Sequence, residues 1–199
     1  NYQLSQGNLQ AVGSQSLIQP DAIEKEQGQE SAAYVGDNFE VSSKISLYAG
    51  IRFSMFQYLG PKNVYAYQAG ESKEASSIID TVHYGAGKPI ATYSGVEPRF
   101  SIRYSLPRSS SIKFSYNRMR QYIQVLSNTT TIAPTDLWKL SDSYIRPQVG
   151  DQFSIGYYKT WRGSVFEFSA EAYYKTIQNA VDFKNAAVVL MNHHVETDI

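Results

Sequence analysis

Hydrophobic and polar residues alternate strictly along "KISLYAGIRFSM", residues 44–55. The odd positions from Ile45 to Met55 are apolar, whereas the even positions are mostly polar and include Arg52. A period of two places successive side chains on opposite faces of a β-strand. The pattern therefore predicts a strand with one apolar and one wet face. The apolar face covers either the core of a soluble sandwich or lipid.

Similar alternation recurs along the chain and predicts an all-β fold of antiparallel strands. We expect full strands at six places, with partial strands at both ends: residues 32–39, 44–58, 93–106, 111–126, 151–161 and 164–177. Residues 20–31 permit at most a short helical turn, because Gly28 interrupts them and they lack an apolar stripe. Pro98 has no N–H group, which predicts a bulge or a weak ladder position inside its strand.

The links between these strands alternate in length. Short links lie at residues 38–44, 107–111 and 161–164, and long links at residues 7–31, 59–92, 127–150 and 184–195. A sandwich gives no reason for this order, whereas an up-and-down transmembrane barrel has tight periplasmic turns and long extracellular loops. The links therefore favour a barrel wall with one face in lipid and one lining a wet lumen.

The alternation assigns side chains to these two faces. The residues expected to face lipid are Ile45, Leu47, Ile51, Phe53, Phe100, Ile102, Phe168 and Ala170. The residues expected to face the lumen are Arg52, Glu97, Arg99, Arg103, Lys113, Glu167 and Glu171. Aromatic residues near the short turns suit a periplasmic girdle, with ordinary core as the alternative: Tyr104, Phe114, Trp161 and Phe166.

Composition narrows the function. The 18 basic and 18 acidic residues cancel, so no net field attracts nucleic acid. Cysteine is absent, which excludes disulfides and thiolate metal sites within these residues. No run of about 18 apolar residues occurs, so we expect no transmembrane helix.

Tyrosine is abundant, with 16 residues, and its ring suits both interfaces and binding surfaces. Five tyrosines lie in or beside the predicted long loops, where they could stack on sugars or planar ligands: Tyr65, Tyr67, Tyr84, Tyr93 and Tyr144. The alternative is packing of the loops against one another.

Motifs for catalysis or cofactor binding are weak. "YGAGKP", residues 84–89, lacks the first glycine and the hydroxyl residue of a phosphate-binding loop. His193 and His194 are adjacent, so on a strand they point to opposite faces and do not readily share a metal. Glu97, Glu167 and Glu171 alternate with cations and suit a mixed-charge wall better than paired catalytic carboxylates. We expect no enzyme activity, no cofactor and no metal.

Several sequence segments also occur in a characteristic order: "SAAYVGDNFEVSSKISLYAGIRFSMF", "EPRFSIRYSL", "SIKFSYNRMRQYIQVLSN", "PTDLWKLSDSYIRPQVGDQFSIGYYK" and "FEFSAEAYYKTIQNAVDFK". Together they resemble the middle of the barrel of TonB-dependent outer-membrane receptors. The likeness is closest to large Gram-negative receptors that carry an N-terminal carboxypeptidase-regulatory-like domain. The resemblance implies a barrel of about 22 strands with a plugged lumen.

The resemblance also implies a role and partners. Such receptors lie in the outer membrane of Gram-negative bacteria. They take up iron chelates, haem, cobalamin, peptides or glycans, energised by an inner-membrane TonB complex. We expect residues 1–199 to be a partial barrel domain without the plug domain and the remaining strands. The expected partners are that plug, the TonB complex, outer-membrane lipid and a small nutrient ligand, but no nucleic acid. The alternative function is a soluble β-sandwich module whose tyrosine-rich loops bind carbohydrate or peptide.

Overall fold

The computed structural model describes residues 1–5, 8–9, 21–22, 25–126, 137–161 and 165–182. Nearly all regular structure in these residues is β, apart from the short 3₁₀ helix η1 (Ala75–Ser77). The strands are β1 (Tyr2–Leu4), β2 (Asn8–Leu9), β3 (Asp21–Ala22), β4 (Glu26–Ser42), β5 (Ile45–Leu59), β6 (Lys62–Tyr67), β7 (Ile78–Tyr84), β8 (Pro89–Leu106), β9 (Ser110–Gln121), β10 (Ile123–Leu126), β11 (Leu137–Leu140), β12 (Gln148–Trp161) and β13 (Phe166–Gln178). None of the described residues form a helix long and apolar enough to cross a membrane.

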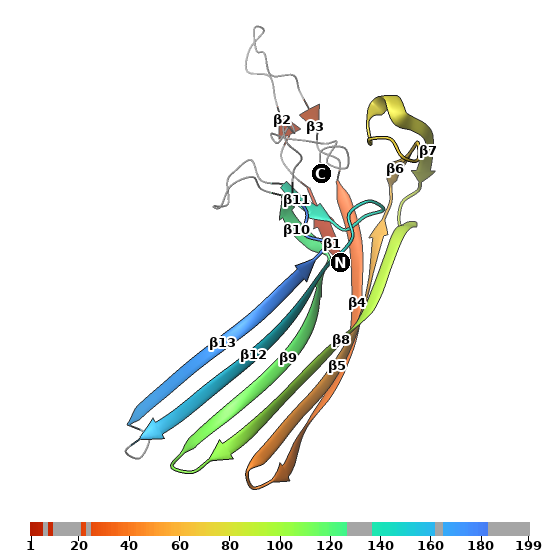
Figure 1. Ribbon diagram of the computed structural model, residues 1–199. Helices are drawn as coiled ribbons and strands as arrows, with labels where there is room; N and C mark the ends of the chain where they lie inside the picture. Colours follow the sequence, from red (N-terminus) through yellow and green to blue (C-terminus); the bar gives the residue numbers. More distant parts are fainter. Residues whose placement is uncertain (6–7, 10–20, 23–24, 127–136, 162–164, 183–199) are drawn as a thin grey trace.

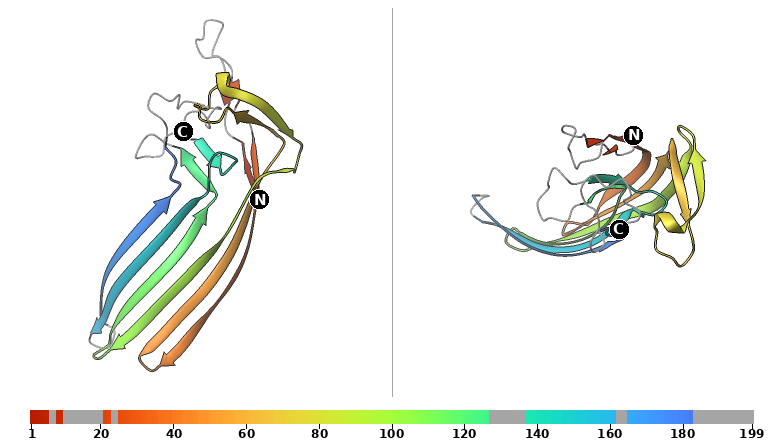
Figure 2. Two further views of the ribbon diagram at one scale, coloured as in Figure 1. Left: turned by 45° about the vertical axis from the view of Figure 1, so that its right-hand side comes forward. Right: turned by 90° about the horizontal axis from the view of Figure 1, so that it is seen from above.

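Seven strands form one antiparallel sheet in the order β1-β4-β5-β8-β9-β12-β13. The long strands run side by side, and the sheet curls like a segment of a barrel wall (Figures 1 and 2). The remaining pairs, β2–β3, β6–β7 and β10–β11, are two-stranded ribbons. The described residues therefore form one curled sheet with small ribbons, not two sheets packed face to face as in a sandwich.

The two ends of the sheet differ in the length of their connections, as the alternating link lengths predict. Residues 43–44 join β4 to β5, and residues 107–109 join β8 to β9, at the same end of the sheet (Figure 1). Arg108 and Ser109 adopt left-handed backbone, with φ of 61° and 53°, which lets the second chain reversal stay tight. The ribbons β6–β7 and β10–β11 lie at the opposite end, which we call the mouth.

Two local expectations were wrong. Residues 26–31 are not a helical turn but the start of β4, whose pairing with β5 runs from Gln27 onward and overrides their weak local preference. The expected strand 111–126 divides at Tyr122: β9 stays in the sheet, while β10 leaves it and pairs with β11. The Tyr122 ring stacks on Phe56, with centroids 4.9 Å apart, and this contact holds the bend.

Pro98 forms no bulge, contrary to one of the two alternatives for it. It pairs with Ile51 of β5 without a shift in register. The ladder from β8 to β9 starts at the next residue, Arg99. Pro98 therefore lies where one of the two ladders ends and its missing N–H group breaks no regular pairing.

The strand register gives the sheet an apolar outer face. Ile51 lies opposite Val35 and Pro98, and Phe53 lies opposite Ala33 and Val96. All eight residues expected to face lipid lie on this face: Ile45, Leu47, Ile51, Phe53, Phe100, Ile102, Phe168 and Ala170. Ile51, Phe53 and Phe168 are 47–49 % exposed, so the described residues leave their side chains half uncovered.

Polar and aromatic side chains bound this apolar face at both ends. At the turn end, Trp161 lies directly opposite Phe166. Towards the mouth, Arg118 pairs with Asp151, with Nε and Oδ1 2.8 Å apart. The aromatic rings of Tyr116 and Phe153 lie next to this pair on its apolar side, 4.8 Å apart. Aromatic rings between charge and apolar surface are typical of a membrane–water interface.

Buried residues gather on the concave inner face near the mouth. Phe56, Tyr58, Tyr122 and Leu140 are each at most 2 % exposed and form the main cluster. Phe56 and Tyr58 come from β5, while Tyr122 and Leu140 come from the segment that leaves the sheet. The core thus fixes this segment against the inner face.

Candidate ligand-binding mouth and inner wall

The inner face carries all seven side chains expected to line a lumen. The register places Arg52 opposite Glu97, Arg99 opposite Asn117, Arg103 opposite Lys113, Glu167 opposite Thr160 and Glu171 opposite Gly156. These positions share one face, the opposite of the face that carries Ile51 and Phe53. They are spread over β5, β8, β9 and β13, so they form a wall and not one compact site.

An ion-pair network spans the inner face of β4, β5 and β8. Arg52 bridges Glu30, at 2.7 Å, and Glu97, at 2.8 Å. Glu97 also accepts a hydrogen bond from Ser54 Oγ at 2.6 Å and is only 1 % exposed. The Tyr2 hydroxyl donates to Glu30 at 2.6 Å and so joins β1 to the network. Because the buried carboxylate needs its cation, this network fixes the alignment of neighbouring strands.

A second charge cluster anchors β11 at the mouth. The Lys139 ammonium forms ion pairs with Glu26 of β4 and with Asp142, at 2.9 Å to Asp142 Oδ2. Glu26 also accepts a hydrogen bond from Leu140 N at 2.9 Å, and Lys62 lies 3.7 Å from it. Lys139, Glu26 and Asp142 are all less than 9 % exposed. The cluster therefore ties the chain after β11 to the wall.

Burial and neighbouring charges shift the pKa values of Asp142 and Lys139 in opposite directions. Burial alone would raise the pKa of Asp142, but the Lys139 ammonium and hydrogen bonds from two backbone N–H groups hold it below its ordinary value. Burial alone would lower the pKa of Lys139, but the carboxylates of Glu26 and Asp142 raise it above its ordinary value. Both groups are thus held in their charged forms.

Asp142 also shapes the loop that follows β11. Its Oδ1 accepts hydrogen bonds from the backbone N–H groups of Tyr144, at 2.8 Å, and Ile145, at 2.9 Å. Its carbonyl oxygen accepts one from the Tyr93 hydroxyl at 2.5 Å. These contacts fix the position of Tyr144, which is 36 % exposed.

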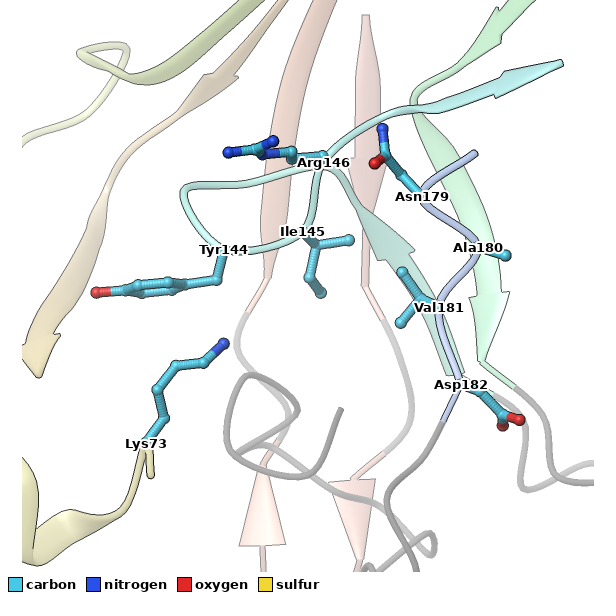
Figure 3. A pocket seen from close by; sticks show the side chains of 8 residues that line it. All are labelled: Lys73, Tyr144, Ile145, Arg146, Asn179, Ala180, Val181 and Asp182. Atoms are coloured by element: carbon cyan, nitrogen blue, oxygen red, sulfur yellow. The ribbon is translucent and has the colours of Figure 1, made fainter. Parts of the chain in front are cut away.

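Three of the five candidate tyrosines meet at the mouth. The Tyr144 ring lies edge-on to Tyr67, with centroids 5.6 Å apart, and its hydroxyl donates to the carbonyl oxygen of Tyr65. The Lys73 ammonium lies 4.8 Å from the centroid of the Tyr144 ring. Tyr144 and Lys73 border an open groove of about 300 Å³ (Figure 3). Its other lining residues are Ile145, Arg146, Asn179, Ala180, Val181 and Asp182.

The other two tyrosines lie elsewhere. Tyr93 belongs to β8 and packs against the buried cluster around Phe56, where its hydroxyl supports the Asp142 loop. Tyr84 ends β7 and lies opposite Lys62 at the base of the β6–β7 ribbon. The structure therefore brings three of the five tyrosines together at the mouth and places the other two elsewhere. Tyr144 is the exposed member of the five, and the other four are partly buried.

A family model described as TonB dependent receptor-like, beta-barrel matches residues 1–192. The chain belongs to this family. No curated protein and no solved structure matches it. TonB-dependent receptors are outer-membrane receptors and transporters of Gram-negative bacteria, and the family is not an enzyme family. Membership explains a sheet whose apolar face is uncovered and whose opposite face is polar.

In this receptor barrel, sequence reasoning missed the charges that shape the mouth. Glu26 lay in a segment expected to be a loop or helical turn, and Lys139 and Asp142 lay in a predicted long loop. The only available signal was local: "LWKLSD" places a lysine among apolar residues, which is unusual for a solvated loop. Glu26 and Lys139 are 113 residues apart, so no spacing rule links them.

The motifs that we judged weak in the sequence lie in separate parts of the chain. "YGAGKP" runs from the end of β7 to the start of β8. His193 and His194 lie outside the described residues. Within the described residues, no three His, Cys, Asp or Glu side chains are grouped as a metal site would require. Glu97, Glu167 and Glu171 are not brought together, since Glu97 pairs with Arg52 on β5 and the other two lie on β13.

Proposed function

We propose that this chain forms part of the wall and mouth of a receptor barrel that takes up a nutrient in an energised step. The observation that carries the proposal is the two-faced sheet, apolar and half exposed outside, charged and hydrogen-bonded inside. In a bilayer, a sheet can expose apolar side chains to lipid while polar side chains face water or an enclosed domain. The cargo belongs to one of five classes: iron chelate, haem, cobalamin, peptide or glycan.

The mouth tyrosines are the proposed ligand contacts within this chain. Tyr144 presents its ring on a loop that Asp142 holds in place, and Lys73 adds a cation beside that ring. Tyr67, at the end of β6, lies edge-on to it. Aromatic faces stack on sugars and planar ligands, and little ordering entropy is lost where the ring is already fixed. We assign Tyr65, Tyr84 and Tyr93 supporting roles, because their contacts lie in the β6–β7 ribbon or the core.

We also propose the partners that the family implies for the intact receptor. These are a plug domain inside the barrel, an inner-membrane TonB complex and outer-membrane lipid. A barrel of about 22 strands would need further strands beside β4 and β13. An N-terminal carboxypeptidase-regulatory-like domain completes the proposed receptor.

Cysteine labelling tests the wall assignment, because these 199 residues contain no native cysteine. Spin labels on single cysteines at Phe53 and Ile155 should be relaxed strongly by oxygen, which concentrates in the lipid of outer membranes. Labels on single cysteines at Ser101 and Ser115, on the inner face, should be relaxed much less by oxygen. Equal relaxation by oxygen on both faces would contradict a lipid-exposed wall.

Uptake tests the transport assignment in cells that express the intact receptor. A radiolabelled panel would contain a ferric siderophore, haem, cobalamin, an oligopeptide and an oligosaccharide. Accumulation of one compound should require both the receptor and the proton-motive force, and a protonophore should abolish it. Accumulation that a protonophore leaves unchanged would exclude energised uptake.

A further inference from the structure

Arg146 is an exposed cation that lines the groove at the mouth, and it forms no ion pair with any described residue. Figure 3 shows it on the same side of the groove as the Tyr144 ring and the Lys73 side chain. Residues 179–182 line the other side. Two cations and an aromatic ring are therefore gathered along one side of an open groove.

The residues on either side of Arg146 are anchored. Ile145 and Pro147 are both buried. Ile145 N donates to Asp142 Oδ1 at 2.9 Å, and the Ile145 carbonyl oxygen accepts a hydrogen bond from Asp142 N at 3.0 Å. The Pro147 carbonyl oxygen accepts one from Asn179 Nδ2 at 2.9 Å. The backbone of Arg146 is thus fixed before a ligand arrives, which reduces the ordering entropy lost on binding.

The carboxylate in the same loop does not neutralise Arg146. Asp142 is instead bound by the Lys139 ammonium at 2.9 Å and by two backbone N–H groups. Asp182 lines the groove but forms no ion pair with Arg146. The guanidinium presents a planar fork of N–H donors whose geometry matches a carboxylate. The groove therefore offers a fixed cation to an anionic ligand.

Apolar surface lies beside this cation. Val181 lines the groove and packs against the buried cluster that contains Ile145. The Tyr144 ring adds an aromatic edge. A ligand that joins a carboxylate to an apolar or planar part would match both features, whereas a neutral, uniformly polar ligand would leave the guanidinium unused.

We propose that this groove binds the carboxylate of the transported nutrient, with Arg146 as its direct contact. The apolar part of the nutrient lies against Tyr144 and Val181, and Lys73 adds positive charge. This inference rests on the proposed function and narrows its five cargo classes. Haem carries carboxylates on its propionate groups, and a peptide carries one at its C-terminus. A neutral glycan and cobalamin, whose side chains are amides, carry none.

Equilibrium binding to the intact receptor in isolated outer membranes tests the proposal without an energy source. One pair of probes is haem and its dimethyl ester, and the other is an N-acetylated apolar tetrapeptide and its C-terminal amide. Cobalamin and a neutral oligosaccharide are the probes without a carboxylate. One of the two acids should bind about tenfold more tightly than its neutral partner, as expected for one charge-assisted contact. The pair that shows the difference identifies the source of the carboxylate.

Substitution of Arg146 tests the contact itself. Arg146→Gln should weaken binding of that acid about tenfold and leave binding of its neutral partner unchanged, so that the two losses are not additive. Arg146→Lys keeps the charge without the fork and should restore part of the affinity. Lys88→Gln is the matched control, because Lys88 is an exposed cation just before β8 and outside the groove. It should change neither affinity. Each variant is first checked for a folded, heat-modifiable barrel.

Three outcomes would overturn the inference. Failure of both acids to bind, with or without binding of cobalamin or the oligosaccharide, would mean that the groove takes no carboxylate nutrient. Equal binding of an acid and its neutral partner would mean that the carboxylate is not recognised. Equal weakening of both by Arg146→Gln would give Arg146 a packing role only.

Uptake by cells separates these outcomes from failure of the proposed function. Energised accumulation of a neutral compound would overturn the inference and leave the proposed function standing. Carboxylate binding that depends on Arg146, without accumulation of any compound, would support the site and contradict energised uptake.

Discussion

Lys139 shows how one buried charge can position a surface loop. It is 4 % exposed and holds Glu26 of the wall and Asp142 of the loop together. Replacing one partner of a buried ion pair leaves the others unpaired, which typically costs about 3–5 kcal/mol. We predict that Lys139→Met releases the loop, seen as faster hydrogen exchange at Leu140 N in the intact receptor. Lys62→Met removes a cation 3.7 Å from Glu26 and should have a smaller effect. Equal effects would contradict the central place of Lys139.

The same cluster predicts how the loop responds to pH. Asp142 has a folded-state pKa below its ordinary value of 3.8, so its contribution is complete above that value and is lost as pH falls below it. Lys139 has a raised pKa, so its contribution is complete below 10.5 and is lost as pH rises through the raised value. A spin label at Ser143 should stay immobile between these limits and become mobile in acid. Asp142→Asn should mobilise it at neutral pH, and a label that is unaffected by this variant would contradict the prediction.

Each long strand has one side chain series on the outer face and one on the inner face. Adjacent residues of β8 allow the two faces to be compared. Phe100 faces outward and Ser101 faces inward at nearly the same depth. Arginine on the lipid side of a barrel costs about 2–4 kcal/mol near the bilayer midplane. We predict that Phe100→Arg lowers the folded, heat-modifiable fraction of the intact receptor much more than Ser101→Arg does. Equal losses would mean that the outer face does not contact lipid.

The sequence alone predicts a strand well where its hydrophobic pattern matches the neighbours with which the strand pairs in the fold. β5 was recognised because its alternation from Ile45 to Met55 matches the two faces it presents. β10 was assigned to the sheet because the pattern alone cannot show that Tyr122 turns inward to stack on Phe56, a contact between residues 66 positions apart in sequence (122 minus 56). The inner-wall charges could be assigned to a face, because they alternate with apolar residues along their strands. The Glu26–Lys139 pair could not, because only the assembled mouth brings these residues together.

At the scale of the whole molecule, the mouth and the wall have separable tasks. In the proposed function, the mouth determines which nutrient binds, whereas the energised step requires the complete receptor. Tyr144→Ala removes the exposed ring but leaves Asp142, Lys139 and the inner-wall network in place. We therefore predict that it raises the nutrient concentration for half-maximal uptake about tenfold, in line with the loss of one stacking contact. The maximal uptake rate should change little.

Tyr84→Ala is the matched control for this prediction, because Tyr84 lies at the base of the β6–β7 ribbon and makes no ring contact with Tyr144. It should leave the half-maximal concentration unchanged. A fall in maximal rate at unchanged half-maximal concentration for Tyr144→Ala would instead place Tyr144 in the transport step. Equal effects of the two substitutions would mean that the tyrosines support loop packing. In that case ligand contacts would have to come from parts of the receptor outside this cluster.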